Sequence, residues 1–413
     1  MTAAWHFKHY FRSNAFGWRG SVLACKRLNE AVAEIKKMTK TDPVLAGEGV
    51  VALCERLWPA LQHVDSSSGS LGGAVHRALD GLLPLLIAAP ANLKTRRKWL
   101  ERMEQAILDD GVDYLVNVRQ VWGKVCADET LMDECADSLL PMIRRMWTEE
   151  ERHVYAHSAQ TLMCLSCLLE SGRDEELQAL LASAPRRNWD EQSYWAEALR
   201  RRGDFDAAIA FAEGCRSPQG YDEAEIGAFC EQALLDAGDW KEAYTRYGQH
   251  LRAGHTYLNQ YRAIVKKYPM LDRRRILQDL IVGTANAGEW FAAARTDGQL
   301  DIALECAQNG QVNPGTLATA AHDTIQSAPE FSFAVALRAL DLFLSGYGYE
   351  DRWSEMLKAA EALVGAAKAL GNPPSCLAQV QSLVPRVRGS QDPLAKPLRQ
   401  HLERNWPGLH WSN

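Results

Sequence analysis

Four side chains with metal-binding chemistry lie close together in the sequence. His153 and His157 are followed by Cys164 and Cys167, and on one helix all four would share a single stripe. A straight helix rises about 1.5 Å per residue and would separate His153 from Cys167 by about 21 Å, so one tetrahedral ion cannot bind all four. Either the cysteines pack in the core, or one pair ligates a metal with partners elsewhere. We favour core packing and expect no cofactor.

The N-terminal segment interleaves aromatic and basic side chains. Trp5 and Trp18 stand among Lys8, Arg12 and Arg19, and residues 1–40 carry eight Lys or Arg against Glu30 and Glu34, a local charge of +6. Aromatic rings beside cations can stack on bases while the cations neutralise phosphates. The same residues can instead fold back over the first helices, with their basic ends reaching water. We favour this capping or partner-docking role and keep nucleic-acid binding as an alternative.

No catalytic motif is present in the sequence. The glycine-rich segment 65–73 (DSSSGSLGG) precedes a helical pattern, but it lacks the Lys of a phosphate-binding loop and follows no strand, so we interpret it as a helix connection. The pair His322-Asp323 lacks the further His and Asp of a metal phosphohydrolase. The basic run Lys266-Lys267 with Arg273-Arg274-Arg275 is most simply a solvated helix face and turn.

Composition is that of an ordinary globular protein. The chain has 413 residues, 46 basic and 52 acidic, with a net charge of −6; 47% are apolar and 24% charged. The most apolar stretch, Leu79 to Ala91, contains Asp80 and two prolines, so we expect no transmembrane span. The N-terminus lacks the apolar core of a secretory signal. Ten cysteines lie mostly within helical patterns, which favours free thiols in the cytoplasm.

Helical periodicity dominates the chain. Apolar residues recur at spacings of three and four in almost every long segment, which predicts an all-α fold. Alternating residues in Val112–Val118 also fit a strand, but no second strand is available to pair with it, so a helix is predicted there. Breaks are expected at Thr41-Asp-Pro43, within residues 65–73 and around Pro90.

Four segments repeat one pattern: an apolar helix, a glycine, a bulky residue, and a second amphipathic helix with a small residue near its start. Their turn glycines are Gly172, Gly203, Gly238 and Gly288, and the wider last gap predicts an extra helix at about Tyr257 to Tyr268. The pattern resembles the tetratricopeptide-type repeat, best in Gly203-Asp-Phe-Asp-Ala-Ala208 and Gly238-Asp-Trp-Lys-Glu-Ala243. The resemblance covers about residues 158–310. It implies a right-handed α-solenoid of helix–turn–helix repeats, with irregular helical N- and C-terminal parts.

The same resemblance implies a function and a set of groove residues. Such repeats bind proteins or peptides on the concave surface formed by the first helix of each hairpin. The corresponding positions here are Ser193, Glu197, Arg200 and Arg201 in one copy, and Ala228, Gln232 and Asp236 in the next. Chaperone-tail binders of this family carry Lys and Asn where this chain has Ser193/Glu197 and Ala228/Gln232. We therefore expect a polar or mixed-charge helix as the partner, not an acidic tail.

The sequence thus predicts a non-catalytic, cytoplasmic scaffold or adaptor with a protein or peptide partner and no membrane contact. Three regions are expected: residues 1–145, the repeat region 146–312, and residues 313–413. One alternative is a nucleic-acid-binding subunit of a bacterial defence or regulatory complex that uses the N-terminal aromatic and basic residues. A second is a metal-dependent hydrolase of unrecognised type, centred on the loop 65–73 or on His153 and His157.

Overall fold

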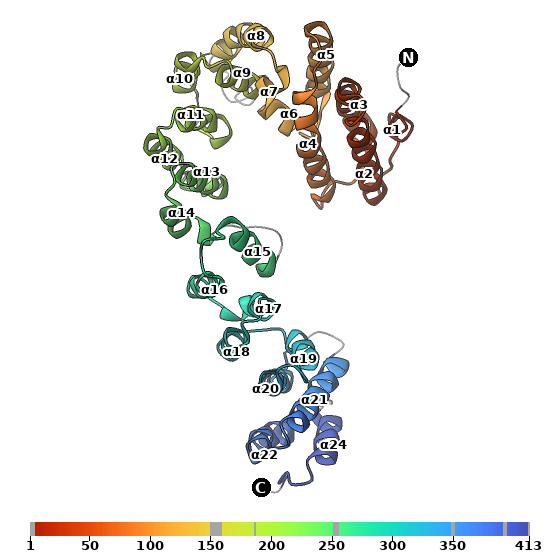
Figure 1. Cartoon of the computed structure of the whole chain (residues 1–413). Helices are drawn as coiled ribbons and strands as arrows, with labels where there is room; N and C mark the ends of the chain where they lie inside the picture. Colours follow the sequence, from red (N-terminus) through yellow and green to blue (C-terminus); the bar gives the residue numbers. More distant parts are fainter. Residues whose placement is uncertain are drawn as a thin grey trace. The chain divides into compact units, whose positions relative to one another are not determined.

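The computed structural model describes residues 5–148, 159–185, 187–250, 256–347, 352–390 and 395–411. These residues form helices joined by turns and loops, and no strand occurs among them (Figure 1). The all-α prediction is therefore confirmed for the described chain. Two compact units are present, unit 1 (residues 1–238) and unit 2 (residues 239–413). Of the boundaries predicted from the sequence, 145/146 falls inside a helix and 312/313 between two helices; the three-region division stays a prediction.

Unit 1 is built from thirteen helices in its described residues. They are α1 (Phe7–Tyr10), α2 (Ser21–Met38), α3 (Pro43–Leu61), α4 (Ser70–Ala88), α5 (Leu93–Asp109), α6 (Val116–Gln120), α7 (Trp122–Cys126), α8 (Glu129–Thr148), α9 (Ala159–Glu170), α10 (Asp174–Ala182), α11 (Trp189–Arg201), α12 (Phe205–Glu213) and α13 (Glu223–Asp236).

Helices α2 to α5 lie side by side and enclose the first part of the core (Figure 1). Helix α3 begins at the predicted break, where Asp42 accepts a hydrogen bond from the Leu45 N–H (2.9 Å) and Pro43 occupies the first turn. Asn92 caps α5 in the same way through the Thr95 N–H (2.9 Å). Polar caps therefore fix where these helices start, and the apolar faces behind them fill the core.

The N-terminal aromatic side chains are mostly part of that core. Trp5, Phe7, Phe11 and Phe16 are each at most 5% exposed. Trp5 lies against Gly49 of α3, where an added Cβ would come within 2.5 Å of the indole ring. The folded-back arrangement therefore holds for these four rings.

One helix of unit 1 has the length and composition of a membrane span. Helix α4 has 19 residues and a mean hydropathy of 1.3, and it is the one such helix among the described residues. Core helices of globular proteins have the same properties. In unit 1, Leu71, Val75, Leu79, Leu82 and Leu86 of α4 are all fully buried, and the helix packs against α2 and α3.

Unit 1 continues through helical hairpins toward α13. Helix α9 packs on α10 and α11 on α12, while α11 also contacts α9 and α13. The turn glycines Gly172 and Gly203 have φ of +69° and +79°, and Gly238, after α13, has +83°. Side chains with a Cβ rarely adopt this backbone conformation. Glycine is thus required at three of the four turns predicted from the sequence.

Unit 2 contains η1 (Gly248–His250), η2 (Ala287–Trp290) and eleven α-helices in its described residues. They are α14 (Trp240–Arg246), α15 (Tyr257–Lys267), α16 (Arg273–Val282), α17 (Phe291–Thr296), α18 (Leu300–Asn309), α19 (Pro314–Asp323), α20 (Pro329–Leu344), α21 (Arg352–Ala369), α22 (Pro374–Gln381), α23 (Val384–Gly389) and α24 (Ala395–Asn405). Helix α15 confirms the extra helix expected near Tyr257. Helices α19, α20 and α21 pack on one another, and α24 contacts α21 and α23.

The fourth predicted turn differs from the other three. Gly288 lies within η2 and is buried, and the left-handed glycine nearby is Gly298, with φ of +80° between α17 and α18. Glycine is instead needed at position 288 because the backbone of Gln311 occupies the space that a Cβ atom would take. A glycine can be needed for a left-handed turn or for close contact with another backbone, and the sequence does not distinguish the two. Gly288 was therefore predicted to be a turn glycine.

Two loop boundaries also differ from the predictions. The helix expected over Val112–Val118 begins only at Val116, because Asp113 has φ of +62° and the Asp110 carboxylate accepts the N–H groups of Val112 (3.2 Å) and Leu115 (2.8 Å). Helix α4 begins at Ser70, so the last residues of the glycine-rich segment 65–73 are helical. The Asp110 side chain decides the first boundary, whereas α4 follows Gly69, which has φ of +68° and provides no side-chain cap.

We expect His401 of α24 to make unit 2 sensitive to acid. Its Nε2 atom is buried without a hydrogen-bond partner among the described residues, and burial lowers its pKa below 6.5. His401 therefore binds a proton more readily in the unfolded chain than in the folded one. Unit 2 keeps this contribution to its stability in full above about pH 6.5 and loses it as the pH falls below that value. Urea unfolding at pH 7.5 and pH 5.0 should show a smaller loss for His401→Phe than for the wild-type chain. Equal losses would contradict this role.

Candidate functional site

A groove in unit 1 gathers residues from the first helices of successive hairpins. Its cavity of about 350 Å³ is lined from α9, α11 and α13, and from the segment that joins α6 to α7. Three of the groove residues predicted from the sequence, Ser193, Glu197 and Arg201, line it together. The cavity therefore lies on the helices that the repeat pattern assigned to a concave face.

The floor of the groove is apolar and aromatic. Trp189 and Tyr194 of α11 are almost fully buried, and Phe229 of α13 is half-buried. The rings of Trp189 and Phe229 meet edge to face with centroids 5.4 Å apart. Leu169 and Val121 complete the apolar lining. Phe229 leaves part of its ring open to a ligand, while the rings beneath it are held by the core.

A buried hydroxyl fixes the wall of the groove. The Tyr194 hydroxyl donates a 2.8 Å hydrogen bond to the carbonyl oxygen of Gln120, which ties α11 to the end of α6. Burial raises the pKa of Tyr194 far above its usual value, so the hydroxyl keeps its proton and remains a donor. Below it, the Gly123 N–H donates to the Ser166 hydroxyl oxygen (3.0 Å), where an added Cβ would strike the Ser166 carbonyl. The groove is thus preformed by contacts between its walls.

Charged side chains connect the three helices along the rim. Arg201 makes a bidentate ion pair with Glu170 of α9 (2.7 and 3.1 Å) and bonds Glu197 within α11 (2.9 Å). Arg200 bonds Glu197 (2.7 and 2.9 Å) and pairs with Asp236 of α13. The Gln232 amide donates to the other Asp236 oxygen (2.8 Å). Five of the seven predicted groove residues therefore belong to one network; of the other two, Ala228 is exposed and does not line the cavity.

Glu197 is the centre of this network. Burial alone would raise the pKa of Glu197, but hydrogen bonds from Arg200 and Arg201 outweigh that effect and lower it below its usual value. Glu197 is therefore charged at neutral pH and forms ion pairs with both arginines. Ser193 stands outside this network. Its hydroxyl donates to the Asp190 carbonyl oxygen (3.0 Å) one turn earlier, and the residue lines the groove.

Sequence reasoning missed the aromatic floor and the α6–α7 wall. Trp189, Tyr194 and Phe229 are apolar residues on helical faces, which the pattern assigned to the core without distinguishing a groove. Gln120, Val121 and Lys124 come from a segment more than 40 residues away in sequence, and no local signal brings it to α9 and α11. A cluster of aromatic residues on the first helices was the one usable signal.

The remaining predicted sites are placed as follows. Lys8 is half-buried, Arg12 and Arg19 are exposed, and Trp18 is 67% exposed, while Trp5 is in the core. Of the two predicted tryptophans, Trp18 is therefore the exposed one, and the exposed Arg19 follows it in the sequence. Nucleic-acid binding through this segment stays a prediction.

His153 and His157 lie outside the described residues, whereas Cys164 and Cys167 are fully buried in α9. The Cys167 thiol is hydrogen-bonded to the thiols of Cys126 and Cys135, and burial raises the pKa of Cys164 to about 12. Within the described ranges, no three His, Cys, Asp or Glu side chains are grouped so as to hold a metal ion. The two cysteines pack as core residues of unit 1.

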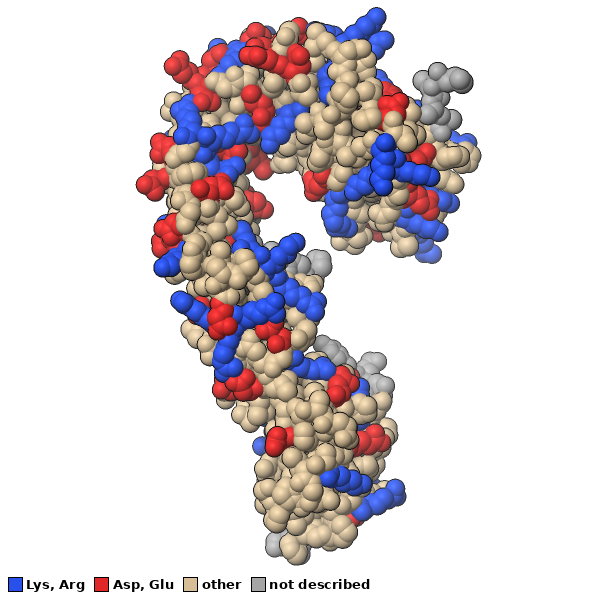
Figure 2. Space-filling view, viewed as in Figure 1, with Lys and Arg blue, Asp and Glu red and all other residues tan. Residues whose placement is uncertain are grey.

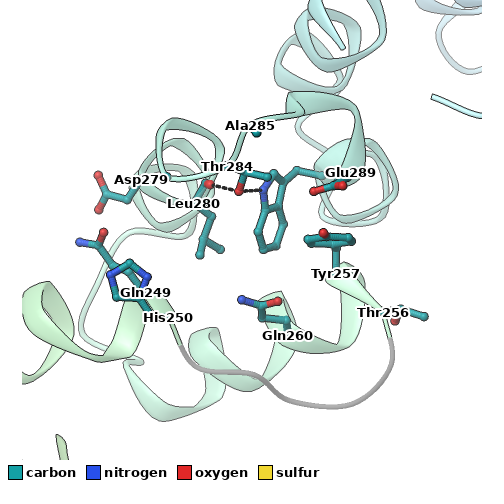
Figure 3. A pocket seen from close by; sticks show the side chains of 12 residues that line it. Gln249, His250, Thr256, Tyr257, Gln260, Asp279, Leu280, Thr284, Ala285 and Glu289 are labelled. Atoms are coloured by element: carbon teal, nitrogen blue, oxygen red, sulfur yellow. Dashed lines mark hydrogen bonds between the residues drawn. The ribbon is translucent and has the colours of Figure 1, made fainter. Parts of the chain in front are cut away.

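Unit 2 contains a larger cavity, of about 600 Å³, between α15, α16 and η2 (Figure 3). The rings of Tyr257 and Trp290 meet edge to face at 5.0 Å, and the Trp290 indole N–H donates to the Thr284 hydroxyl (2.8 Å). Asp279 and Glu289 lie on different sides of the cavity in Figure 3, and no Lys or Arg is among its described lining residues. The described lining therefore carries two carboxylates, together with His250 and the hydroxyls of Thr256 and Thr284.

No family model matches the chain, and no curated protein matches its sequence.

Proposed function

We propose that unit 1 is a non-catalytic interaction module that binds a segment of a protein partner in the groove between α9, α11 and α13. The observation that carries the proposal is a preformed cavity with an aromatic floor and a charged rim, built on successive first helices. Apolar cavities with a few placed polar groups are common binding sites. This proposal includes a tetratricopeptide-like repeat in a right-handed solenoid arrangement. It also includes a scaffold or adaptor role and a cytoplasmic location.

The rim favours a particular partner chemistry. Glu170, Asp190, Glu197 and Glu225 line the groove against two cations, Lys124 and Arg201. Because Arg201 is already paired with Glu170 and Glu197, the surface offers a partner more acceptors than donors. Figure 2 shows acidic and basic side chains interleaved over this part of unit 1. We therefore expect a mixed-charge segment with Lys or Arg and an apolar anchor for Phe229.

The arginines of the rim are poor positions for testing this proposal. Reversing the charge of Arg200 or Arg201 would place a carboxylate beside Glu170, Glu197 and Asp236 and would disturb the network itself. Ser193 is better suited, because its hydroxyl bonds the Asp190 carbonyl oxygen of its own helix and the residue lines the groove. An arginine there would fill the cavity and find carboxylates nearby, so the fold should persist.

We expect Ser193→Arg to weaken partner binding at least tenfold. The matched control is Ala210→Arg, which adds the same side chain to the exposed surface of α12. Tagged wild-type and variant chains would be used for pull-downs from the native host, with bound proteins quantified by mass spectrometry. A partner retained by Ala210→Arg and lost by Ser193→Arg supports the groove. A partner that both variants retain would contradict it.

The same eluate tests the nucleic-acid alternative, which the exposed ring of Trp18 beside Arg19 favours. Nuclease-sensitive absorbance at 260 nm that is lost on Trp18→Ala would move the function to the N-terminal segment. A stoichiometric protein partner with a low 260/280 ratio would support the groove.

A further inference from the structure

A second cavity of unit 2 lies on another side of α15 and is lined by basic side chains. Its volume is about 440 Å³, and its lining includes Arg262 and Lys266 of α15, and Arg273 at the start of α16. The end of α17 supplies Asp297. The volume lies within the range of small-molecule sites.

Two of the three basic side chains have no hydrogen-bond or ion-pair partner within the described part of the chain. Arg262 and Lys266 are four residues apart, so they share one face of α15. Both are exposed, and neither makes a hydrogen bond or ion pair within the described part of the chain. Two positive charges therefore face the cavity without a protein partner.

The single carboxylate of the cavity is already satisfied. Asp297 accepts hydrogen bonds from Arg273 (3.0 Å) and Gln299 (2.9 Å), and its side chain is only 11% exposed. Burial alone would raise the pKa of Asp297, but bonds from Gln299, Tyr261 and Arg273 lower it below its usual value. Asp297 thus balances Arg273, while the remaining guanidinium N–H groups of Arg273 are free to bind an anion. The cavity keeps an excess of two positive charges.

The excess of positive charge is limited to this cavity, because neighbouring arginines lie beside carboxylates. Arg274 pairs with Asp301, and Arg275 lies 3.8 Å from Asp279. The neighbouring cavity around Tyr257 carries Asp279 and Glu289 instead (Figure 3). Lys and Arg gather on the surface over α15 to α17 in Figure 2, but the other arginines of the predicted basic run have carboxylate partners. A compact anion therefore fits better than an extended nucleic acid, which needs a row of free cations.

We propose that this cavity binds the phosphate group of a small phosphorylated molecule. Arg262, Lys266 and Arg273 would hold the phosphate oxygens, because guanidinium groups offer paired donors that match phosphate and an ammonium adds a point charge. Leu258, Val265 and Ala293 provide apolar walls for the organic part of the ligand. The site is independent of the groove in unit 1.

The test is calorimetric titration of the full chain with inorganic pyrophosphate at low ionic strength. We expect saturable binding that weakens at least tenfold in the double variant Arg262→Ala, Lys266→Ala. The control variant Lys368→Ala, Arg388→Ala removes the same charge from exposed helical positions of unit 2 and should bind as the wild type does. Urea midpoints equal to wild type would show that both variants are folded.

Three outcomes would overturn the proposal: no saturable binding by the wild type, equal weakening in both double variants, or equal affinity for sulfate at the same ionic strength. Each would mean that only general charge attraction acts at this surface. Titration with adenosine monophosphate and with adenosine tests the organic part. Tighter binding of the monophosphate, lost with Arg262 and Lys266, supports a phosphorylated ligand. Equal binding of adenosine contradicts it.

Discussion

Arg96→Ala is expected to lower the free energy of unfolding of unit 1 by about 4 kcal/mol. Arg96 is 4% exposed and donates hydrogen bonds to the carbonyl oxygens of Leu86 (2.7 Å) and Ala89 (2.6 Å). These carbonyls end α4, where the helix dipole also favours a cation. Removing the guanidinium takes the charged donor from both buried carbonyls, which keep only the backbone N–H groups of Ala89 (3.3 Å) and Ala91 (2.8 Å). It also opens a cavity beside Trp99, over whose ring Arg96 lies.

The neighbouring residue provides the control for this prediction. Arg97 is exposed and pairs with Glu134 at the surface, so Arg97→Ala should change stability little. Arg96→Lys should fall between the two, because one ammonium cannot span both carbonyls. Urea unfolding followed by tryptophan fluorescence measures all three variants. Equal midpoints for Arg96→Ala and Arg97→Ala would show that the buried guanidinium does not stabilise the end of α4.

Gly288→Ala is expected to destabilise unit 2 by about 3 kcal/mol. A Cβ at this position would lie 2.6 Å from the Gln311 carbonyl carbon and 2.9 Å from its nitrogen, and backbone atoms cannot swing away as a side chain can. Asn286 holds the two segments together: its Oδ1 accepts the N–H groups of Gly288 (3.0 Å) and Gln311 (2.8 Å). Separating the backbones to admit a methyl group would break these bonds.

Gly283→Ala is the matched control in the same unit. Its Cβ would meet only carbonyl oxygens at 3.6 and 3.8 Å, which is ordinary contact. Circular dichroism during thermal unfolding should show a large drop in Tm for Gly288→Ala and little change for Gly283→Ala. If the two variants melt together, the close approach of η2 to Gln311 is not a constraint on the fold.

The sequence was sufficient for the helices because the signals that form them are local. Periodic apolar faces, the Asp42-Pro43 cap and the turn glycines Gly172 and Gly203 all act within a few residues. The predictions for Val112–Val118 and Gly288 were only partly right: the predicted helix begins at Val116, and Gly288 lies within η2 instead of at a left-handed turn. Asp110 accepts the N–H groups of Val112 and Leu115, a local contact that apolar periodicity does not show. Gln311 reaches Gly288 from 23 residues away, so a tertiary contact decides the role of Gly288.

In the groove, too, some features could be predicted from local sequence patterns and others depend on contacts between distant segments. The repeat pattern placed Ser193, Glu197 and Arg201 on one face, and the structure brings them to one cavity. The ion pair between Arg201 and Glu170, and the contact of Tyr194 with Gln120, join segments 31 and 74 residues apart. Such contacts depend on how helices pack, so the aromatic floor and its α6–α7 wall could not be derived from periodicity.

The most direct test of the groove is photo-crosslinking in the native host. A diazirine-bearing lysine analogue would replace Lys124, which lines the groove, and in a second chain Lys26, which is exposed on α2 outside it. The proposal predicts one partner crosslinked from position 124 and absent from position 26, with the crosslink lost in a Ser193→Arg background. The same partner crosslinked equally from both positions, or unaffected by Ser193→Arg, would contradict a partner-binding groove.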